Sequence, residues 1–308
     1  MAEMHNTGIL LESGTNEIEI MEFTIDGNLY GINVAKVKEI MIAEPVKPMP
    51  HAHAAVEGIF KPRDEVLTVV DLPKYLNGGD GQRGEKDIFI ITNFNKMFIA
   101  FRVHSVVQIS RISWTDIQKP DKAVSGGAEG VATGIAQCGD DLVTILDFER
   151  IVAEIAPQTS IQVAEIDALG LRERNTHPIW MAEDSVLLTR LIKESLHKAG
   201  YVNLRSFPDG KALWDALCEL PKGGDIYDQV SLIITDIEMP QMDGHRLTKL
   251  VKDNERFKKV PLIIFSSLIS DEMRIKGLQL GADEQLTKPE IGHLVGVMDH
   301  LLIQSGQK

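Results

Sequence analysis

The chain has little cysteine and no long apolar run, and both features limit the kinds of protein that it could be. Its 308 residues hold two cysteines, Cys138 and Cys218, which are far apart and lack the spacing of metal ligands. This predicts unpaired thiols in a reducing compartment. No apolar stretch is long enough to span a bilayer, and residues 1–16 lack the charged-then-apolar pattern of a secretion signal. We therefore expect a cytoplasmic protein with no direct insertion into a membrane.

Positive charge is also in short supply. Acidic residues outnumber basic ones by 45 to 32, for a formal net charge of −13. Nucleic acids and anionic membranes attract basic surfaces, so neither is expected as a main partner. The composition is otherwise ordinary for a globular protein, with 44% apolar and 25% charged residues. The length predicts about two domains, each with its own core.

The first domain is expected over residues 17–156. Short segments rich in β-branched and aromatic residues alternate there with turn signals such as Asp26-Gly27-Asn28. This pattern predicts an all-β fold of small antiparallel barrels. Short helices are expected near Val34–Met41 and Phe148–Ile155.

The pattern changes at residue 177 and stays the same to residue 308. Five apolar strands alternate with five amphipathic helices, which predicts a doubly wound parallel sheet. Right-handed crossovers place all the strand-end loops at one edge of such a sheet. Residues 157–176 are expected to form a linker that is partly helical, and residues 1–16 a flexible N-terminus.

Three acidic residues end apolar strands in the second domain. Asp236 closes the run Leu232–Thr235, and Glu183 and Asp184 close the run Pro178–Ala182. Because the carboxyl ends of parallel strands meet at one edge, the three carboxylates are expected to lie together. Such a cluster is costly unless a cation or a proton occupies it. Mg²⁺ suits the site, since it binds one or two carboxylates, keeps waters and shares oxygens with a phosphate.

Two further strand ends contribute Ser266 and Lys288. Beside the acids, they suit a phosphoryl group whose oxygens would be neutralised by Lys288 and hydrogen-bonded by Ser266. Asp236, on the central strand, is the best candidate for the nucleophile that forms an aspartyl-phosphate. Taken singly, each residue could be a helix cap or a solvated side chain. An aspartate-nucleophile hydrolase is the alternative chemistry, but it would need a second Asp where this chain has Glu238.

Residues 177–308 resemble the CheY-like receiver domains of two-component systems. The matching positions are Glu183-Asp184, Asp236, Met239-Pro240, Asp243-Gly244, Ser266, Gly281-Ala282 and Lys288-Pro289. The resemblance implies a flavodoxin-like fold with strand order 2-1-3-4-5, which is known for this family. It also implies a phosphoacceptor that takes phosphate from a kinase phosphohistidine, with only self-dephosphorylation expected, so the chain is not expected to be an enzyme.

The resemblance further assigns roles at the site. Asp236 would accept the phosphoryl group, and Ser266 and Lys288 would contact it. The Lys288–Pro289 peptide bond would be cis. The implied ligands of Mg²⁺ are Glu183, Asp184, Asp236 and the backbone carbonyl of Glu238.

Three positions depart from the receiver pattern. Glu183 stands where Asp is usual, Gln285 occupies the switch position where an aromatic residue is often found, and Glu290 also replaces a common aromatic residue. We therefore expect phosphorylation to proceed and its effect to be relayed without the usual aromatic ring.

The first domain resembles the CheW coupling domain. The resemblance covers nearly the whole of residues 17–156, from Tyr30-Gly31 through Val56-Glu57-Gly58 to Asp147-Phe148-Glu149. It implies two small five-stranded barrels without an active site, which bind chemoreceptor cytoplasmic tips and the histidine kinase CheA. Glu39 and Arg63 are the residues we expect at the partner interface, although either could simply close a turn.

The order of the two domains resembles that of the CheV family of chemotaxis adaptors. It predicts an adaptor that couples chemoreceptors to CheA in polar receptor arrays and is regulated by Mg²⁺-dependent phosphorylation at Asp236. A constitutive adaptor with a non-responsive receiver and a phosphate sink for CheA are the alternatives.

Overall fold

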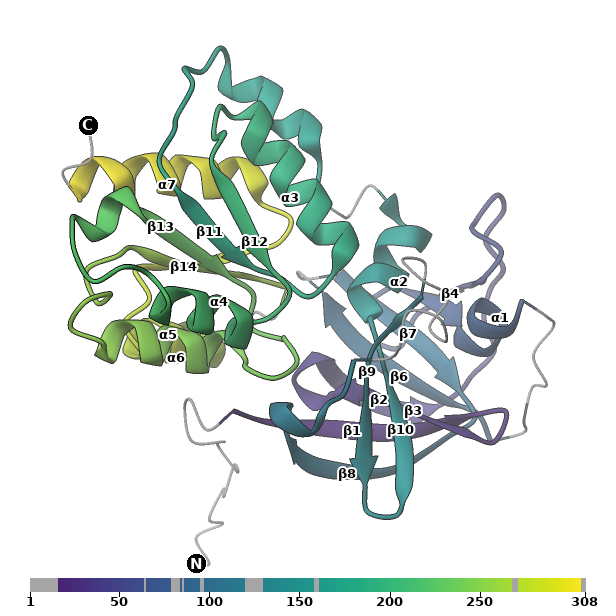
Figure 1. Cartoon of the computed structure of the whole chain (residues 1–308). Helices are drawn as coiled ribbons and strands as arrows, with labels where there is room; N and C mark the ends of the chain where they lie inside the picture. The colour runs from purple at the N-terminus through teal and green to yellow at the C-terminus, as the bar shows by residue number, and fades with distance from the viewer. Residues whose placement is uncertain are drawn as a thin grey trace, which may run out of the picture.

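The computed structural model describes residues 16–63, 65–78, 84, 86–94, 97–119, 130–157, 161–267 and 271–305. The chain forms three five-stranded sheets, two in the first half (up to residue 157) and one in the second half (from residue 161). Figure 1 shows the two halves lying against each other. No helix in the described part of the chain has the length and apolar character needed to span a membrane.

Ten strands make the two sheets of the first half. One sheet has the order β8 (Ser105–Ser113), β1 (Glu17–Ile25), β2 (Asn28–Asn33), β10 (Asp141–Leu146) and β9 (Ala132–Cys138). The other has the order β3 (Val37–Ile42), β6 (Ile88–Phe94), β7 (Met97–Val103), β5 (Leu67–Asp71) and β4 (Val56–Phe60). The predicted all-β fold with two small five-stranded units is confirmed. Neighbouring strands are antiparallel except β2 with β10 and β5 with β7.

A shared aromatic core joins these two sheets. The ring of Phe148 lies 4.8 Å from that of Phe101 on β7 and 6.3 Å from that of Phe23 on β1, measured between centroids. All three side chains are buried. Phe148 begins helix α2 (Phe148–Ile155), which confirms the short helix expected there. The residues next to Phe148 in the sequence are therefore placed at the boundary with the second half.

The helix expected over Val34–Met41 is wrong. Val34–Lys36 forms a single 3₁₀ turn, capped by the Asn33 side chain, and Val37–Ile42 forms strand β3. This strand pairs antiparallel with β6, and its residues alternate between half-buried and exposed. Three of its six residues are β-branched, which favours a strand, and pairing with β6 decided between the two possibilities. The first half also contains a short helix, α1 (Leu72–Asn77), that was not expected.

The second half is a doubly wound sheet in which all strands are parallel. Its order is β12 (Leu204–Phe207), β11 (Ile179–Ala182), β13 (Leu232–Thr235), β14 (Leu262–Ser266) and β15 (Glu284–Thr287). This is the predicted order 2-1-3-4-5. Helices α3 (Val186–Lys198) and α7 (Ile291–Gln304) bury apolar side chains in one core cluster, and α4 (Gly210–Cys218) and α5 (Gly244–Asp253) in another. Figure 1 shows α6 (Asp271–Gln279) on the α4 and α5 side.

The segment between the two halves packs against the second half. A 3₁₀ helix, η5, spans Val163–Leu169 within the stretch expected to be partly helical. Ile161 and Ile166 join the core cluster beneath α3 and α7. Arg172 then forms an ion pair with Asp299 of α7, with an N–O distance of 2.6 Å. Residues 1–15, part of the expected flexible N-terminus, lie outside the described residues, whereas Asn16 is hydrogen-bonded to residues of the second half.

Candidate functional site

The three predicted acids lie together at the carboxyl ends of β11 and β13. These strands are neighbours in parallel register, with Ala182 opposite Thr235. The residues that follow, Glu183 with Asp184 and then Asp236, therefore leave the sheet side by side. One carboxylate oxygen from each lies within 4.8 Å of the others. Glu183 and Asp236 are each only 3% exposed.

Lys288 is the cation at the centre of this cluster. Its Nζ lies 2.9 Å from Oδ2 of Asp236 and 2.8 Å from Oε2 of Glu183. Burial opposes the charge of a lysine, but the Asp236 and Glu149 carboxylates, and Glu183 when it is ionised, raise the pKa of Lys288 well above its usual value. These carboxylates therefore favour the charged ammonium form of Lys288. The Lys288–Pro289 peptide bond is cis.

The acids repel one another in this buried position. Burial raises the pKa of Glu183 to about 8, with the Asp236 charge adding to the rise and Lys288 opposing it. The pKa of Asp184 is also raised, by burial and by the charges of Glu183 and Asp147. A cluster of hard oxygen donors that holds protons so strongly fits a divalent cation, which would take the place of those protons. The donors present thus fit Mg²⁺.

Ser266 lies beside Lys288 at the same edge of the sheet. It ends β14 opposite Thr287 of β15, is fully buried, and accepts a hydrogen bond at its carbonyl from the Lys288 N–H at 3.1 Å. Gln285, at the switch position, is also buried, and its amide has no hydrogen-bond partner among the described residues. It packs against Gly277 of α6, where an added Cβ would lie 2.2 Å from its Oε1. The absence of a side chain at Gly277 makes the room that Gln285 occupies.

Residues of the first half that no sequence motif predicted complete the site. Lys36, in the 3₁₀ turn before β3, lies 2.6 Å from Oε2 of Glu238 and 3.4 Å from Oε1 of Glu149. Asn33 donates a hydrogen bond of 2.6 Å to the other Glu238 oxygen. Glu149, on the first turn of α2, lies 3.5 Å from Lys288 Nζ. No local signal in the sequence marks these residues, because each acts only across the boundary between the halves.

Glu149 is the one strongly ionised acid among these newly identified residues. Its burial would raise its pKa, but Lys288 and Lys36 together lower it to about 2, and Ser267 donates a hydrogen bond to it. The pKa of Glu238, by contrast, is raised, mainly by burial. Glu149 is therefore an anion held between two lysines, one from each half.

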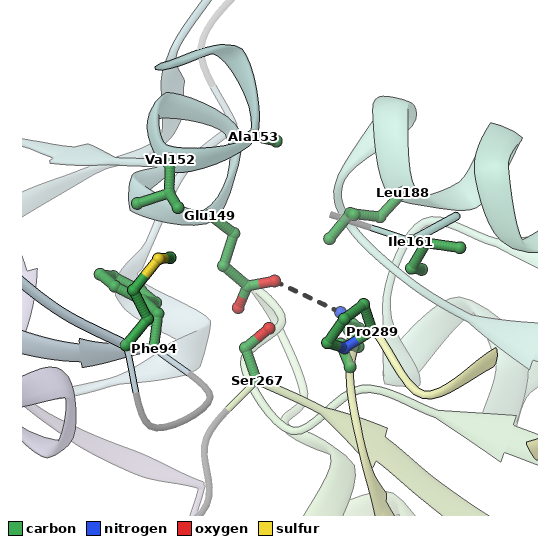
Figure 2. Close-up of a pocket in the computed structure, with 10 residues that line it drawn as sticks. Phe94, Glu149, Val152, Ala153, Ile161, Leu188, Ser267 and Pro289 are labelled. Atoms are coloured by element: carbon green, nitrogen blue, oxygen red, sulfur yellow. Dashed lines mark ion pairs between the residues drawn. The ribbon is translucent and has the colours of Figure 1, made fainter. Parts of the chain in front are cut away.

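Two cavities meet at Glu149. A small one, of about 40 Å³, is lined by the acids of the second half together with Asn33, Lys36 and Asp147 of the first. A larger one, of about 240 Å³, has mostly apolar walls; it is lined by Phe94, Met97, Val152, Ala153, Ile161, Leu188 and Pro289, with Glu149, Ser267 and Lys288. Figure 2 shows the Glu149 side chain between α2 and the Ser267 and Pro289 loops, with its ion pair to Lys288 dashed.

The two residues expected at a partner interface lie elsewhere. Glu39 on β3 and the exposed Arg63 line a common hollow of about 250 Å³ with Lys38, Pro62 and Glu65. Neither lines the acidic cavity. The structure thus brings Glu39 and Arg63 together and separates them from the acids.

Comparisons with known proteins identify both halves. The CheW-like domain family matches residues 19–156, and the response regulator receiver domain family matches residues 179–298. Chemotaxis protein CheV3 of Helicobacter pylori is 31% identical over 287 residues, which cover 89% of this chain and 91% of that protein. CheV2 of the same organism is 29% identical, over 90% of this chain and 92% of that protein.

Solved structures resemble each half separately. The scaffolding protein TtCheW from Thermoanaerobacter tengcongensis is 23% identical, with a TM-score of 0.39, and the match covers 42% of this chain and 88% of that one. The chemotaxis response regulator CheY4 of Vibrio cholerae is 22% identical, with a TM-score of 0.36, over 42% of this chain and all of that one.

Proposed function

Because the chain belongs to the CheV family of chemotaxis proteins, with a CheW-like domain followed by a receiver domain, we propose that it couples chemoreceptors to the histidine kinase CheA under the control of phosphorylation at Asp236. The proposed domain limits are residues 17–156 for the coupling domain, 157–176 for the linker and 177–308 for the receiver domain. The protein would work in the cytoplasm, at polar chemoreceptor arrays.

The observation that carries the phosphorylation proposal is the position of Lys288. Its ammonium contacts both Asp236 and Glu183 in a buried site, where a charge-assisted contact is strong. In the proposed reaction, an Asp236 oxygen attacks the phosphorus of a phosphohistidine. A P–O bond forms while the P–N bond breaks, and its electron pair stays on the imidazole nitrogen. Lys288 then neutralises the oxygens of the transferred group, and the Ser266 hydroxyl donates a hydrogen bond to one of them.

The acidic residues would hold the cofactor. Glu183, Asp184, Asp236 and the carbonyl of Glu238 are the proposed ligands of Mg²⁺, which would supply further positive charge for the phosphoryl oxygens. The protein's own contribution is to keep these oxygens together in one small, largely buried site. Glu183 must lose its proton before it can bind the ion, because its pKa is raised to about 8.

The coupling domain would supply the partner contacts. Glu39 and Arg63, which line a common hollow on this domain, are the residues we propose at the interface with CheA or with the chemoreceptor tips. An acidic and a basic side chain beside a hollow suit a partner that inserts a side chain there. In this proposal the domain has no catalytic role, and the receiver domain only accepts and releases phosphate.

Phosphotransfer from radiolabelled phospho-CheA tests the proposal. The wild-type chain should become labelled in the presence of Mg²⁺ and not in its absence, and Asp236→Asn should abolish the label. Asp253→Asn, which removes an exposed carboxylate of the same domain, serves as the matched control and should be labelled normally. Labelling that persists in Asp236→Asn would contradict the assignment.

One observation favours a constitutive adaptor as the second candidate. Gln285 fills the space beside Gly277, so the usual movement of an aromatic switch residue has no counterpart here. Kinase activity in reconstituted receptor arrays separates the candidates. An Asp236→Asn variant that alters the regulated kinase output supports control by phosphorylation. Unaltered output supports the constitutive adaptor, and a change only in the CheA phosphate level indicates a phosphate sink.

A further inference from the structure

The coupling domain covers the face of the receiver domain that carries Asp236. The loop that follows β13 is held by four hydrogen bonds from the coupling-domain side. Gln241 donates from its N–H to the Trp114 carbonyl at 2.9 Å and from its side chain to the Ile117 carbonyl at 3.1 Å. Asn16 donates to the Gln241 carbonyl at 3.0 Å and accepts from the Asp243 N–H at 2.9 Å. This loop leads directly from the phosphoacceptor.

An alternating set of charges reinforces this contact. Lys36 pairs with Glu238 of the receiver domain and with Glu149 of its own domain, and Glu149 in turn reaches Lys288. The side chains of Lys36, Glu149 and Glu238 are each only 11% exposed. Buried charges are tolerated only when they are paired, so these contacts hold the two domains in one relative position.

The covered site is too small for a phosphodonor. The acidic cavity of about 40 Å³ has room for roughly three water molecules. A phosphohistidine would have to place a phosphoryl group and an imidazole ring against Asp236, which is 3% exposed. Transfer from a kinase therefore requires the coupling domain to move away from the site.

We propose that the docked coupling domain is an intramolecular block on the phosphoacceptor, with Glu149 as the anion that holds Lys288 until a phosphoryl group displaces it. This inference rests on the proposed phosphorylation of Asp236 and adds its regulation. The two lysines make Glu149 resemble a bound anion, since it is fixed by Lys288, Lys36 and Ser267.

Phosphorylation and docking then oppose each other. A phosphoryl group on Asp236 adds negative charge and competes with Glu149 for Lys288, so the Glu149 carboxylate loses its only partner in the receiver domain among the ion pairs described and is repelled by the phosphoryl group. Linkage requires the reverse effect to be equal: a chain that undocks more easily accepts phosphate more easily. The phosphorylated chain would hold its domains apart, which frees the surface of α2 and the 3₁₀ turn of Lys36 for other contacts.

Two variants of the full-length chain test this block. Glu149→Gln removes the charge with little change in shape, and Lys36→Glu places a like charge against Glu149 and Glu238. Glu154→Gln, on the same helix but paired with Arg150 of its own domain, is the matched control. The initial rate of labelling by phospho-CheA reports access to Asp236, and small-angle scattering without any phosphodonor reports the separation of the domains.

We expect the two variants to be labelled roughly tenfold faster than the wild type, because the rate follows the open fraction of the chain. Their radius of gyration should increase, while Glu154→Gln should match the wild type in both measurements. Normal labelling at equal rates in all four chains, or an unchanged radius in both variants, would overturn the block alone. No labelling of any chain would overturn the proposed function and the block with it, and the scattering would still show whether the ion pairs hold the domains together.

Discussion

Replacing Glu183 by Gln should stabilise the receiver domain in the absence of Mg²⁺. The pKa of this buried carboxyl is about 8, against an ordinary value of 4.5. The folded chain therefore keeps a proton that the unfolded chain loses, and unfolding releases it. The free energy of unfolding falls as pH rises from 4.5 to 8, because over this interval the carboxyl ionises in the unfolded chain and not in the folded chain, which favours the unfolded chain.

The magnitude follows from the pH interval. At pH 7, about 2.5 pH units above the ordinary pKa, the carboxyl is ionised in the unfolded chain but still protonated in the folded chain. Each unit contributes about 1.36 kcal/mol, so the free energy of unfolding of the wild type is lowered by about 3 kcal/mol. Gln has the shape of the protonated acid and does not titrate. The free energy of unfolding of Glu183→Gln should therefore equal that of the wild type near pH 4.5 and exceed it by about 3 kcal/mol at pH 7.

Urea unfolding in EDTA at a series of pH values measures this difference, with hydrogen exchange of the β11 and β13 amides reporting on the receiver domain alone. Glu173→Gln, which changes an exposed acid of the same half, should show no such dependence on pH. Adding Mg²⁺ should stabilise the wild type more than Glu183→Gln, because the variant has one ligand fewer. A difference that is constant from pH 4.5 to 8, or a variant less stable than the wild type at pH 7, would refute the reasoning.

Three further predictions concern the same domain. Mg²⁺ affinity, measured by calorimetric titration, should rise by about tenfold per pH unit or more below pH 8, because the ion must displace the Glu183 proton and Asp184 also holds its proton more strongly than usual; an affinity independent of pH would contradict this. Gly244→Ala places a Cβ 1.9 Å from the Asp236 carbonyl oxygen, so the variant should lose about 3 kcal/mol in urea unfolding and accept phosphate poorly. Ile263→Ala, in the fully buried centre of β14, should cost about 3 kcal/mol by the same assay, and a loss below about 1 kcal/mol would indicate a loosely packed core.

Local patterns in the sequence were sufficient where a strand is a continuous apolar run between turn or loop residues. The apolar runs that end in Asp236 and in Glu183-Asp184 predicted parallel strands, and these strands lie side by side with their acids together. The pattern was insufficient at Val34–Met41, where the residues form a turn and strand β3 instead of a helix. Pairing with β6 decided that conformation, and a partner some fifty residues away leaves no local trace.

The amino-acid sequence by itself determined the two folds, the order of the domains and the group of side chains from Glu183 to Lys288. Strand-end residues of a parallel sheet converge on one edge whatever surrounds them, so that group could be found without coordinates. Only the tertiary structure brought Lys36 and Glu149 of the coupling domain onto this edge and closed the cavity over Asp236. Contacts between domains depend on the shape and charge of two folded surfaces, and neither property can be predicted from the hydrophobic pattern of a single segment.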